Sequence, residues 1–451
     1  MKKRRISNVL LFNPWIVDFA AYDFWQKPYG LLHVGAVLKE RGFNVSLLDC
    51  LDRFDPVLSF RHHKEDGSGK YFKEVIEKPQ VLDDIPRYYG RYGFPYDLVV
   101  RKLKALDPPD IVLLTCMMTY WYPAAKEAVS LLRSIFPDAI IVLGGIYATL
   151  CPDHAQRVVK PDILVRGAGE QKILEILSNI DSEIRKDYSH SECCQFSRPL
   201  YDLYPQLNHV GVMTSRGCPF HCDFCASRLL SEYKRYPTDA VIDEINHWYH
   251  QRNVQHFCFY DDALLVDADE YSKPLFRYFA GHKKDIHFHL PNGIHPRYLD
   301  EELAFLFKAA GVRTIRLSYE SKNQTLQREM NKVSDDELER ALEYLHRAGY
   351  PLDSIGVYLL MGLAEQTFED VSASADYIAR LGAKINLASF SPIPGTREWI
   401  KSIQVNLWDE KNDLLLSNNT LFPIWSGKYG YSACMEFLNR LKEKNIKLAA
   451  A

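Results

Sequence analysis

The amino-acid sequence predicts an α/β chain of two successive domains that ends in a short helical extension. Short apolar runs alternate with amphipathic helical patterns, as is typical of parallel sheets, and this occurs twice, over residues 1–180 and 208–400. Residues 181–207 interrupt the rhythm, and their Ser, Glu, Cys and Pro content indicates a linker. A length of 451 residues suits two or three domains of ordinary size. Residues 401–451 form the predicted helical extension.

The first domain is expected to hold five strands, each ending at a polar or glycine turn. We place helices between them, notably at 31–41 and 123–136, and strands at 9–12, 45–48, 111–115, 140–143 and 163–165. Five strands with alternating helices predict a flavodoxin-like doubly wound sheet, in which ligands bind at the carboxyl ends of the strands. Residues 51–98 are rich in charge and aromatic rings, and we expect them to be an insertion between the second and third strands.

The second domain is expected to hold six further strand–helix units. Four of its helices stop at Gly281, Gly311, Gly349 and Gly382, as helix C-termini prefer. Six units are too few for a closed eight-stranded barrel. The predicted strands are 210–214, 256–260, 286–290, 314–319, 355–360 and 385–390.

The composition excludes several classes of partner. The balance of 55 Lys and Arg against 58 Asp and Glu leaves a net charge of −3, so no strong field favours nucleic acid. No stretch approaches the ~20 apolar residues that span a bilayer, and the apolar run after the basic start is too short for a signal peptide. Ten cysteines without a framework spacing indicate a reducing compartment. We therefore expect a cytoplasmic protein without nucleic-acid or membrane partners.

The most informative segment is Cys218-Pro-Phe-His-Cys222-Asp-Phe-Cys225. Three thiolates at this spacing can converge on one iron–sulfur cluster, whose four irons usually take one Cys each, so one iron stays open for another ligand. A zinc ribbon would want four ligands, with His221 as a stray fourth, and a ferredoxin cluster would want a fourth cysteine, which does not follow until Cys258. Three inert buried thiols are a further alternative.

This C-x3-C-x2-C run, preceded by Ser215-Arg216-Gly217, resembles the signature of the radical S-adenosylmethionine (SAM) superfamily. The resemblance implies a 4Fe–4S cluster whose open iron chelates SAM and cleaves it to a 5′-deoxyadenosyl radical, with electrons from a flavodoxin or ferredoxin type of donor. It also implies an open, partial (β/α)6 barrel with its chemistry at the C-terminal strand ends. The acidic pair after the second strand is similar to that of the Elp and methylthiotransferase-like branch of the superfamily.

The same resemblance implies SAM contacts at the ends of the later strands. A carboxylate can accept from both ribose hydroxyls, which suits Glu320, and Asp261 or Asp262 suits the ammonium. The competing interpretation is that strand-end carboxylates cap the next helix or pair with a cation. The expected SAM-binding residues are Asp261, Asp262, Asn292, Ser318, Glu320, Gly362 and Leu363, the last two through backbone around adenine.

The first domain carries glycines at its strand ends, which leave backbone room for a large planar ligand but equally suit a simple left-handed turn. Taken in order, these segments resemble the cobalamin-binding domain of cobalamin-dependent radical SAM enzymes. Some cobalamin enzymes place a histidine under the cobalt with an Asp-x-His-x-x-Gly motif. That motif is missing here, since His154 directly follows Asp153, and the resemblance places the lower corrin face on residues 115–122. The implied cobalamin contacts are Thr115, Met117, Met118, Thr119, Tyr120, Gly144, Gly145, Tyr147, Arg166, Gly167, Gly169 and Glu170.

The resemblance implies methylation of an unactivated carbon through methylcobalamin, because a cobalt without a strong lower ligand favours methyl transfer. One alternative is a radical rearrangement, cyclisation or ring contraction without methyl transfer. Another is a non-catalytic iron–sulfur or zinc module. The substrate is expected to be a small molecule or peptide, and no further catalytic residue can be named.

Overall fold

The structure is a computed structural model, and it describes residues 5–58, 64–181, 184, 197–282, 284–329 and 333–450. The chain divides into two compact units, residues 1–210 and 211–451. Most of the predicted linker at 181–207 lies outside the described residues. Within the described ranges, no helix combines the length and the apolar character that crossing a bilayer requires.

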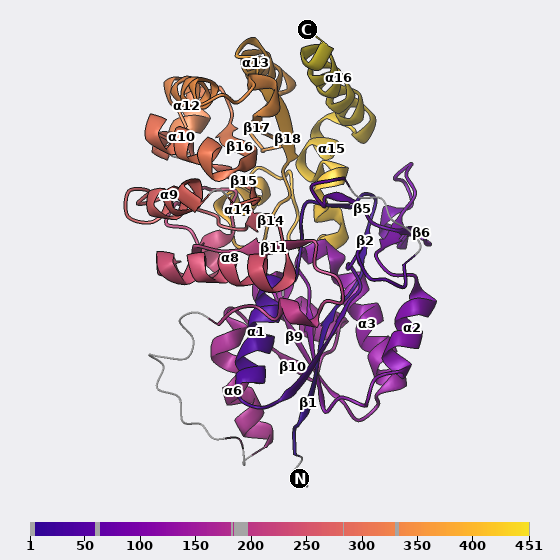
Figure 1. Ribbon diagram of the computed structural model, residues 1–451. Coiled ribbons are helices and arrows are strands. Elements are labelled where there is room, and N and C mark those ends of the chain that lie inside the picture. Colours follow the sequence, from indigo (N-terminus) through magenta and orange to yellow (C-terminus); the bar gives the residue numbers. More distant parts are fainter. Residues whose placement is uncertain are drawn as a thin grey trace. The chain divides into compact units, whose positions relative to one another are not determined.

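The first unit contains a parallel five-stranded sheet in the order β10-β9-β8-β1-β4 (Figure 1). This order confirms the predicted flavodoxin-like topology. Helices α1 (Tyr29–Glu40) and α6 (Gly169–Ile180) pack on one face of the sheet, and α2 (Tyr96–Lys104) and α3 (Tyr122–Ile135) lie on the other. The strands are β1 (Asn8–Asn13), β4 (Asn44–Asp49), β8 (Ile111–Thr115), β9 (Ile140–Gly144) and β10 (Ile163–Leu164).

The predicted insertion at 51–98 folds with residues 16–23, which were not predicted to form strands. Antiparallel pairing joins β2 (Ile16–Asp18) to β7 (Gly90–Tyr92) and β7 to β6 (Lys73–Val75), while β3 (Tyr22–Asp23) pairs with β5 (Gly69–Lys70). Two buried ion pairs strengthen this region: Arg53 Nε lies 2.8 Å from Asp23 Oδ2, and Lys27 Nζ lies 3.3 Å from Asp52 Oδ1. The insertion is thus built into the unit, apart from residues 59–63, which lie outside the described ranges.

The second unit contains a six-stranded parallel sheet whose strands follow one another in chain order, so that β11 and β18 are its edges. This open sheet confirms the predicted partial barrel. Helices α8 (Thr238–Arg252), α9 (Ser272–His282), α10 (Glu301–Ala310), α12 (Asp335–Arg347) and α13 (Phe368–Arg380) connect the strands. The strands are β11 (His209–Val212), β14 (His256–Phe259), β15 (His287–Ile294), β16 (Val312–Glu320), β17 (Gly356–Met361) and β18 (Lys384–Ser389).

Glycine ends three of these helices as expected. Gly311, Gly349 and Gly382 all have positive φ, and a Cβ on Gly311 would lie 2.4 Å from the carbonyl oxygen of Ile286. The expected stop at Gly281 is wrong by one residue, because α9 continues to His282. The predicted extension at 401–451 contains the end of α14 (Arg397–Gln404), followed by α15 (Pro423–Tyr429) and α16 (Tyr431–Ala450).

Phenylalanine rings fill the space between the second sheet and helices α9 and α10. The ring of Phe276 is fully buried and lies 5.7 Å from those of Phe259 and Phe288 and 4.7 Å from that of Phe307, between ring centroids. Edge-on contacts of this kind add to the free energy of burying the rings.

Replacing this ring tests its contribution to stability. Phe276→Ala should lower the free energy of unfolding by about 3–5 kcal/mol, because it removes a large buried side chain and leaves a cavity. Phe305→Ala, on the exposed side of α10 with its side chain 47% exposed, should change it by less than about 0.5 kcal/mol. Urea denaturation of both variants checks this, and equal midpoints would contradict it.

Candidate cofactor sites

The loop that carries the three cysteines begins with a glycine that no other residue can replace without distortion. Gly217 has φ +69°, and a Cβ there would lie 2.6 Å from the carbonyl oxygen of Glu232. Strand β12 (Ser215–Arg216) pairs with β13 (Lys234–Arg235) and closes the base of the loop. We call residues 217–226 the cluster loop.

The cluster loop brings all three thiols to one open cavity. The Cys225 amide donates to the Cys222 carbonyl at 3.1 Å, which folds the second half of the loop. Burial raises the pKa of the Cys218 thiol to about 11, so a metal must displace its proton to bind there. Three convergent sulfurs fit an iron–sulfur cluster that has one open iron.

Asp261 lies just after β14, and its carboxylate holds the residues that precede the cluster loop. Both of its carboxylate oxygens accept from the Thr214 amide at 3.0 Å, and Oδ1 also accepts from the hydroxyls of Thr214 (2.6 Å) and Ser215 (2.7 Å). Burial raises the pKa of Asp261, and these hydrogen bonds oppose the rise. Because its lone pairs are already engaged, this side chain holds the strand ends together. Asp262 lines the same cavity and accepts from Ser227.

The other predicted SAM residues follow the neighbouring strands at the same edge. Ser318 lines the cavity and donates to the Gly293 carbonyl at 3.0 Å. Asn292 donates to the carbonyls of Tyr260 (3.1 Å) and Asp261 (3.2 Å) and so ties β15 to β14. Glu320 is buried at the end of β16 with φ +73°, a left-handed conformation that is uncommon for a non-glycine residue. Asn292 and Glu320 are not among the residues that line the cavity.

Gly362 and Leu363 form a turn after β17 that is held from both sides. Their amides each donate to Gln366 Oε1 at 3.1 Å, while the Leu363 carbonyl accepts from Trp425 Nε1 at 3.0 Å. Both amides already donate to Gln366, so a ligand at this turn would contact the surface of the turn and would not bond to these amides. Neither Gln366 nor Trp425 was predicted. The available signal for Gln366 was its position between a strand end and the N-cap of α13, Thr367.

Aromatic side chains form a wall beside the cysteines. The ring of Phe220 lies 5.4 Å from that of His295 and 5.8 Å from that of Tyr298, and all three residues line the cavity. His295 and Tyr298 were not predicted. The available signal was their position directly after a strand end, where ligand-binding side chains gather.

In the first unit, the loop after β8 lies where the strand order reverses, between β8 and β1. It carries five predicted cobalamin contacts, of which Thr119 and Tyr120 are buried while Met117 is 37% exposed. Two residues of the segment before α1 fix this loop, and neither was predicted. Asp18 Oδ2 accepts from Trp121 Nε1 at 2.8 Å, and Gln26 Nε2 lies 3.0 Å from the Met117 sulfur. The other two contacts in this segment are Thr115 and Met118.

The next two strand ends combine close packing with open space. A Cβ on Gly145 would lie 2.7 Å from the Thr115 hydroxyl, whereas one on Gly144 would meet nothing nearer than 4.0 Å and one on Gly167 would meet nothing within 4 Å. Such an edge fits a flat ligand like a corrin. Tyr147 is fully buried, and its hydroxyl lies 2.7 Å from His154 Nδ1, so both support the edge from inside the unit. The remaining predicted contacts, Arg166, Gly169 and Glu170, lie between β10 and the first turn of α6.

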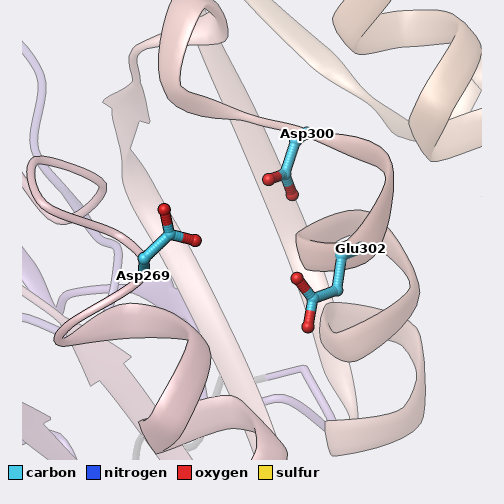
Figure 2. Close-up of side chains that lie close together, drawn as sticks. All are labelled: Asp269, Asp300 and Glu302. Carbon is cyan, nitrogen blue, oxygen red and sulfur yellow. The ribbon is translucent and has the colours of Figure 1, made fainter.

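A cluster of acidic residues near the starts of α9 and α10 resembles a metal site but already holds a cation. Figure 2 shows the carboxylates of Asp269, Asp300 and Glu302 directed toward one space. Lys273 Nζ lies 2.6, 2.5 and 3.0 Å from their oxygens, respectively. Hydrogen bonds that the Lys273 ammonium donates to these carboxylates raise the pKa of Lys273, so the group is a surface ion-pair cluster.

Comparison with known proteins agrees with both sites. The model of the Radical SAM superfamily matches residues 212–378, and that of the B12 binding domain matches residues 91–177. The cytidylyl-2-hydroxyethylphosphonate methyltransferase of Streptomyces wedmorensis is 22% identical, with 91% of this chain and 84% of that protein covered. The anaerobic magnesium-protoporphyrin IX monomethyl ester cyclase of Rubrivivax gelatinosus is 24% identical, with 60% and 54% covered.

The fold is shared with a solved structure. The radical S-adenosylmethionine methyltransferase TsrM from Kitasatospora setae superimposes with a TM-score of 0.66 at 18% identity, covering 90% of this chain and 79% of that one. A likeness at this identity concerns the fold, and it extends over both units.

The cysteine assignment can be tested by iron content. Cys218→Ala, Cys222→Ala and Cys225→Ala should each lose the reconstituted cluster, because two sulfurs do not hold a cubane. Cys258→Ala should keep the full iron content, since Cys258 lies inside β14 and does not line the cavity. Iron analysis and the thiolate-to-iron absorbance measure this, and loss of iron from the last variant would support a four-cysteine cluster instead.

The corrin edge can be tested by filling its open space. Gly144→Leu places a side chain at the end of β9 without a positive-φ conflict, so it should weaken cobalamin binding while thermal unfolding stays unchanged. Gly281→Leu, near the end of α9 with open space around it, is the matched control. Titration followed by corrin absorbance measures the affinity, and normal binding by the first variant would exclude this edge.

Each of the two units therefore carries a site at the carboxyl edge of its own sheet. Three thiols, two aspartates and an aromatic wall surround one cavity in the second unit. Glycines and the loop after β8 open the edge of the first. With the two family matches, these observations establish that the chain combines a B12-binding domain with a radical SAM domain, and that its cofactors are a 4Fe–4S cluster, SAM and cobalamin.

Proposed function

We propose that this chain is a cobalamin-dependent radical SAM methyltransferase that methylates an unactivated carbon. The observation that carries the proposal is the three-thiol loop on a cavity lined by carboxylates, in one chain with a doubly wound B12-binding domain. When bound, the reduced cluster and SAM supply a 5′-deoxyadenosyl radical, and cobalamin supplies a transferable methyl group.

The residues of the chain bind and orient these groups. Cys218, Cys222 and Cys225 would hold three irons and leave the fourth for SAM. Asp262 would accept from the SAM ammonium, while Asp261 keeps the base of the cluster loop in place through Thr214 and Ser215. The rings of Phe220 and Tyr298 would exclude water from one side of the cavity, which strengthens electrostatic contacts inside it.

The names of the relatives support a small-molecule substrate, since one methylates a cytidylyl-linked hydroxyethylphosphonate. We further propose that electrons come from a flavodoxin or ferredoxin type of donor, because the cluster must be reduced from outside. The eight described cysteines are all free of disulfides, which suits the reducing cytoplasm.

A second candidate is a radical cyclisation without methyl transfer. It is favoured by the similarity to an anaerobic cyclase over 60% of the chain. Membership of the Elp and methylthiotransferase-like branch rests on the acidic pair Asp261-Asp262, and the names of the relatives point to methyltransferases and cyclases instead.

Anaerobic product analysis separates these functions. With SAM, reductant and cobalamin, a methyltransferase should yield both 5′-deoxyadenosine and S-adenosylhomocysteine, because SAM serves as radical source and as methyl donor. A cyclase should yield 5′-deoxyadenosine alone, and a non-catalytic module should yield neither. Cys222→Ala is the control and should abolish 5′-deoxyadenosine formation, measured by chromatography and mass spectrometry.

A further inference from the structure

Helix α14 is joined directly to the cluster loop. The Thr396 hydroxyl accepts from the Trp399 amide at 3.2 Å and starts the helix. The Glu398 amide then donates to the carbonyl of Asp223 at 2.9 Å, and Arg397 Nη1 lies 3.2 Å from the Asp223 carboxylate. Asp223 stands between Cys222 and Cys225, so the start of α14 fixes the backbone that carries two of the three thiols.

The same turn of α14 is joined to the loop after β17, residues 362–365. Glu398 Oε1 accepts from the Ala364 amide at 2.9 Å, and Lys401 Nζ lies 2.7 Å from Glu365 Oε2. The Glu398 side chain is buried, so this hydrogen bond is shielded from water. Glu398 thus contacts the cluster loop with its backbone and the loop after β17 with its carboxylate.

Helix α15 braces the second loop again. Trp425 is fully buried, and its Nε1 donates to the Leu363 carbonyl at 3.0 Å. Lys428 Nζ donates to the carbonyl of Gln366 at 3.1 Å. Both contacts come from the C-terminal extension, whose role was not predicted.

We infer that Glu398 is a positioning residue that sets the distance between the cluster loop and the loop after β17, and that the C-terminal extension is part of the SAM-binding scaffold. The inference rests on the proposed function. A ligand chelated at the cluster must reach across the sheet edge to make its remaining contacts, so its affinity depends on how these two loops are held.

Glu398→Ala removes the acceptor for the Ala364 amide, whereas Glu398→Gln keeps an oxygen in its place. We expect Glu398→Ala to retain its iron but to bind SAM about tenfold more weakly, as loss of a buried hydrogen bond to a charged group implies. Glu398→Gln should restore the affinity, and Glu436→Ala, an exposed glutamate of α16, is the matched control. Equilibrium dialysis of SAM into reconstituted, cobalamin-loaded protein and iron analysis measure both quantities.

Wild-type affinity in Glu398→Ala, or failure of Glu398→Gln to restore binding, would overturn the inference. If Glu398→Ala loses iron, Trp425→Phe decides, because it keeps an aromatic ring but removes the donor to Leu363, a residue outside the cluster loop. It should keep its iron and bind SAM several-fold more weakly, and unchanged affinity would overturn the inference. Absence of SAM binding by the wild-type chain would instead contradict the proposed function.

Discussion

The buried carboxylate of Asp261 holds together the two strand ends from which the cysteine-bearing loop begins. Taking a carboxylate out of water is unfavourable unless hydrogen bonds replace its hydration. Here the Thr214 amide and the hydroxyls of Thr214 and Ser215 supply them, and Arg235 donates to the same Thr214 hydroxyl at 2.9 Å. A charge that is satisfied from one side by Thr214 and Ser215, at the junction of β11 and β12, cannot shift without losing several hydrogen bonds at once. The geometry of the three thiols depends on this rigidity.

Both units use the same property of parallel sheets: the carboxyl ends of all strands lie at one edge, and the loops that follow them form a common site. The chemistry of each edge then comes from a few residues. In the second unit these are thiols and carboxylates around a cavity. In the first they are glycines such as Gly144 and Gly167, whose lack of a side chain leaves room for a broad ligand. One architecture thereby serves two cofactors of very different shape.

The sequence predicted the parallel strands of both sheets because each is a short apolar run between clear turn residues. It did not predict β2 and β3, which have three and two residues and pair with partners at least 46 positions away. The cysteine motif could be predicted because its three residues lie within eight positions of the sequence. Trp425 was not, because its contact with Leu363 joins positions 62 apart and leaves no local pattern. Likewise, the sequence suggested a cofactor role for Asp261 but not the hydrogen bonds that engage it.

The ion pairs of the insertion have a consequence for how this region can change. Arg53 with Asp23, and Lys27 with Asp52, are nearly inaccessible to water, and each pair joins the insertion to the segment that precedes α1. Replacing one partner alone leaves the opposite charge unpaired in a low-dielectric interior, which lowers stability far more than replacing both partners. Loss of this subdomain therefore costs least stability when residues 14–28 change together with it, so the two segments are coupled through these charges.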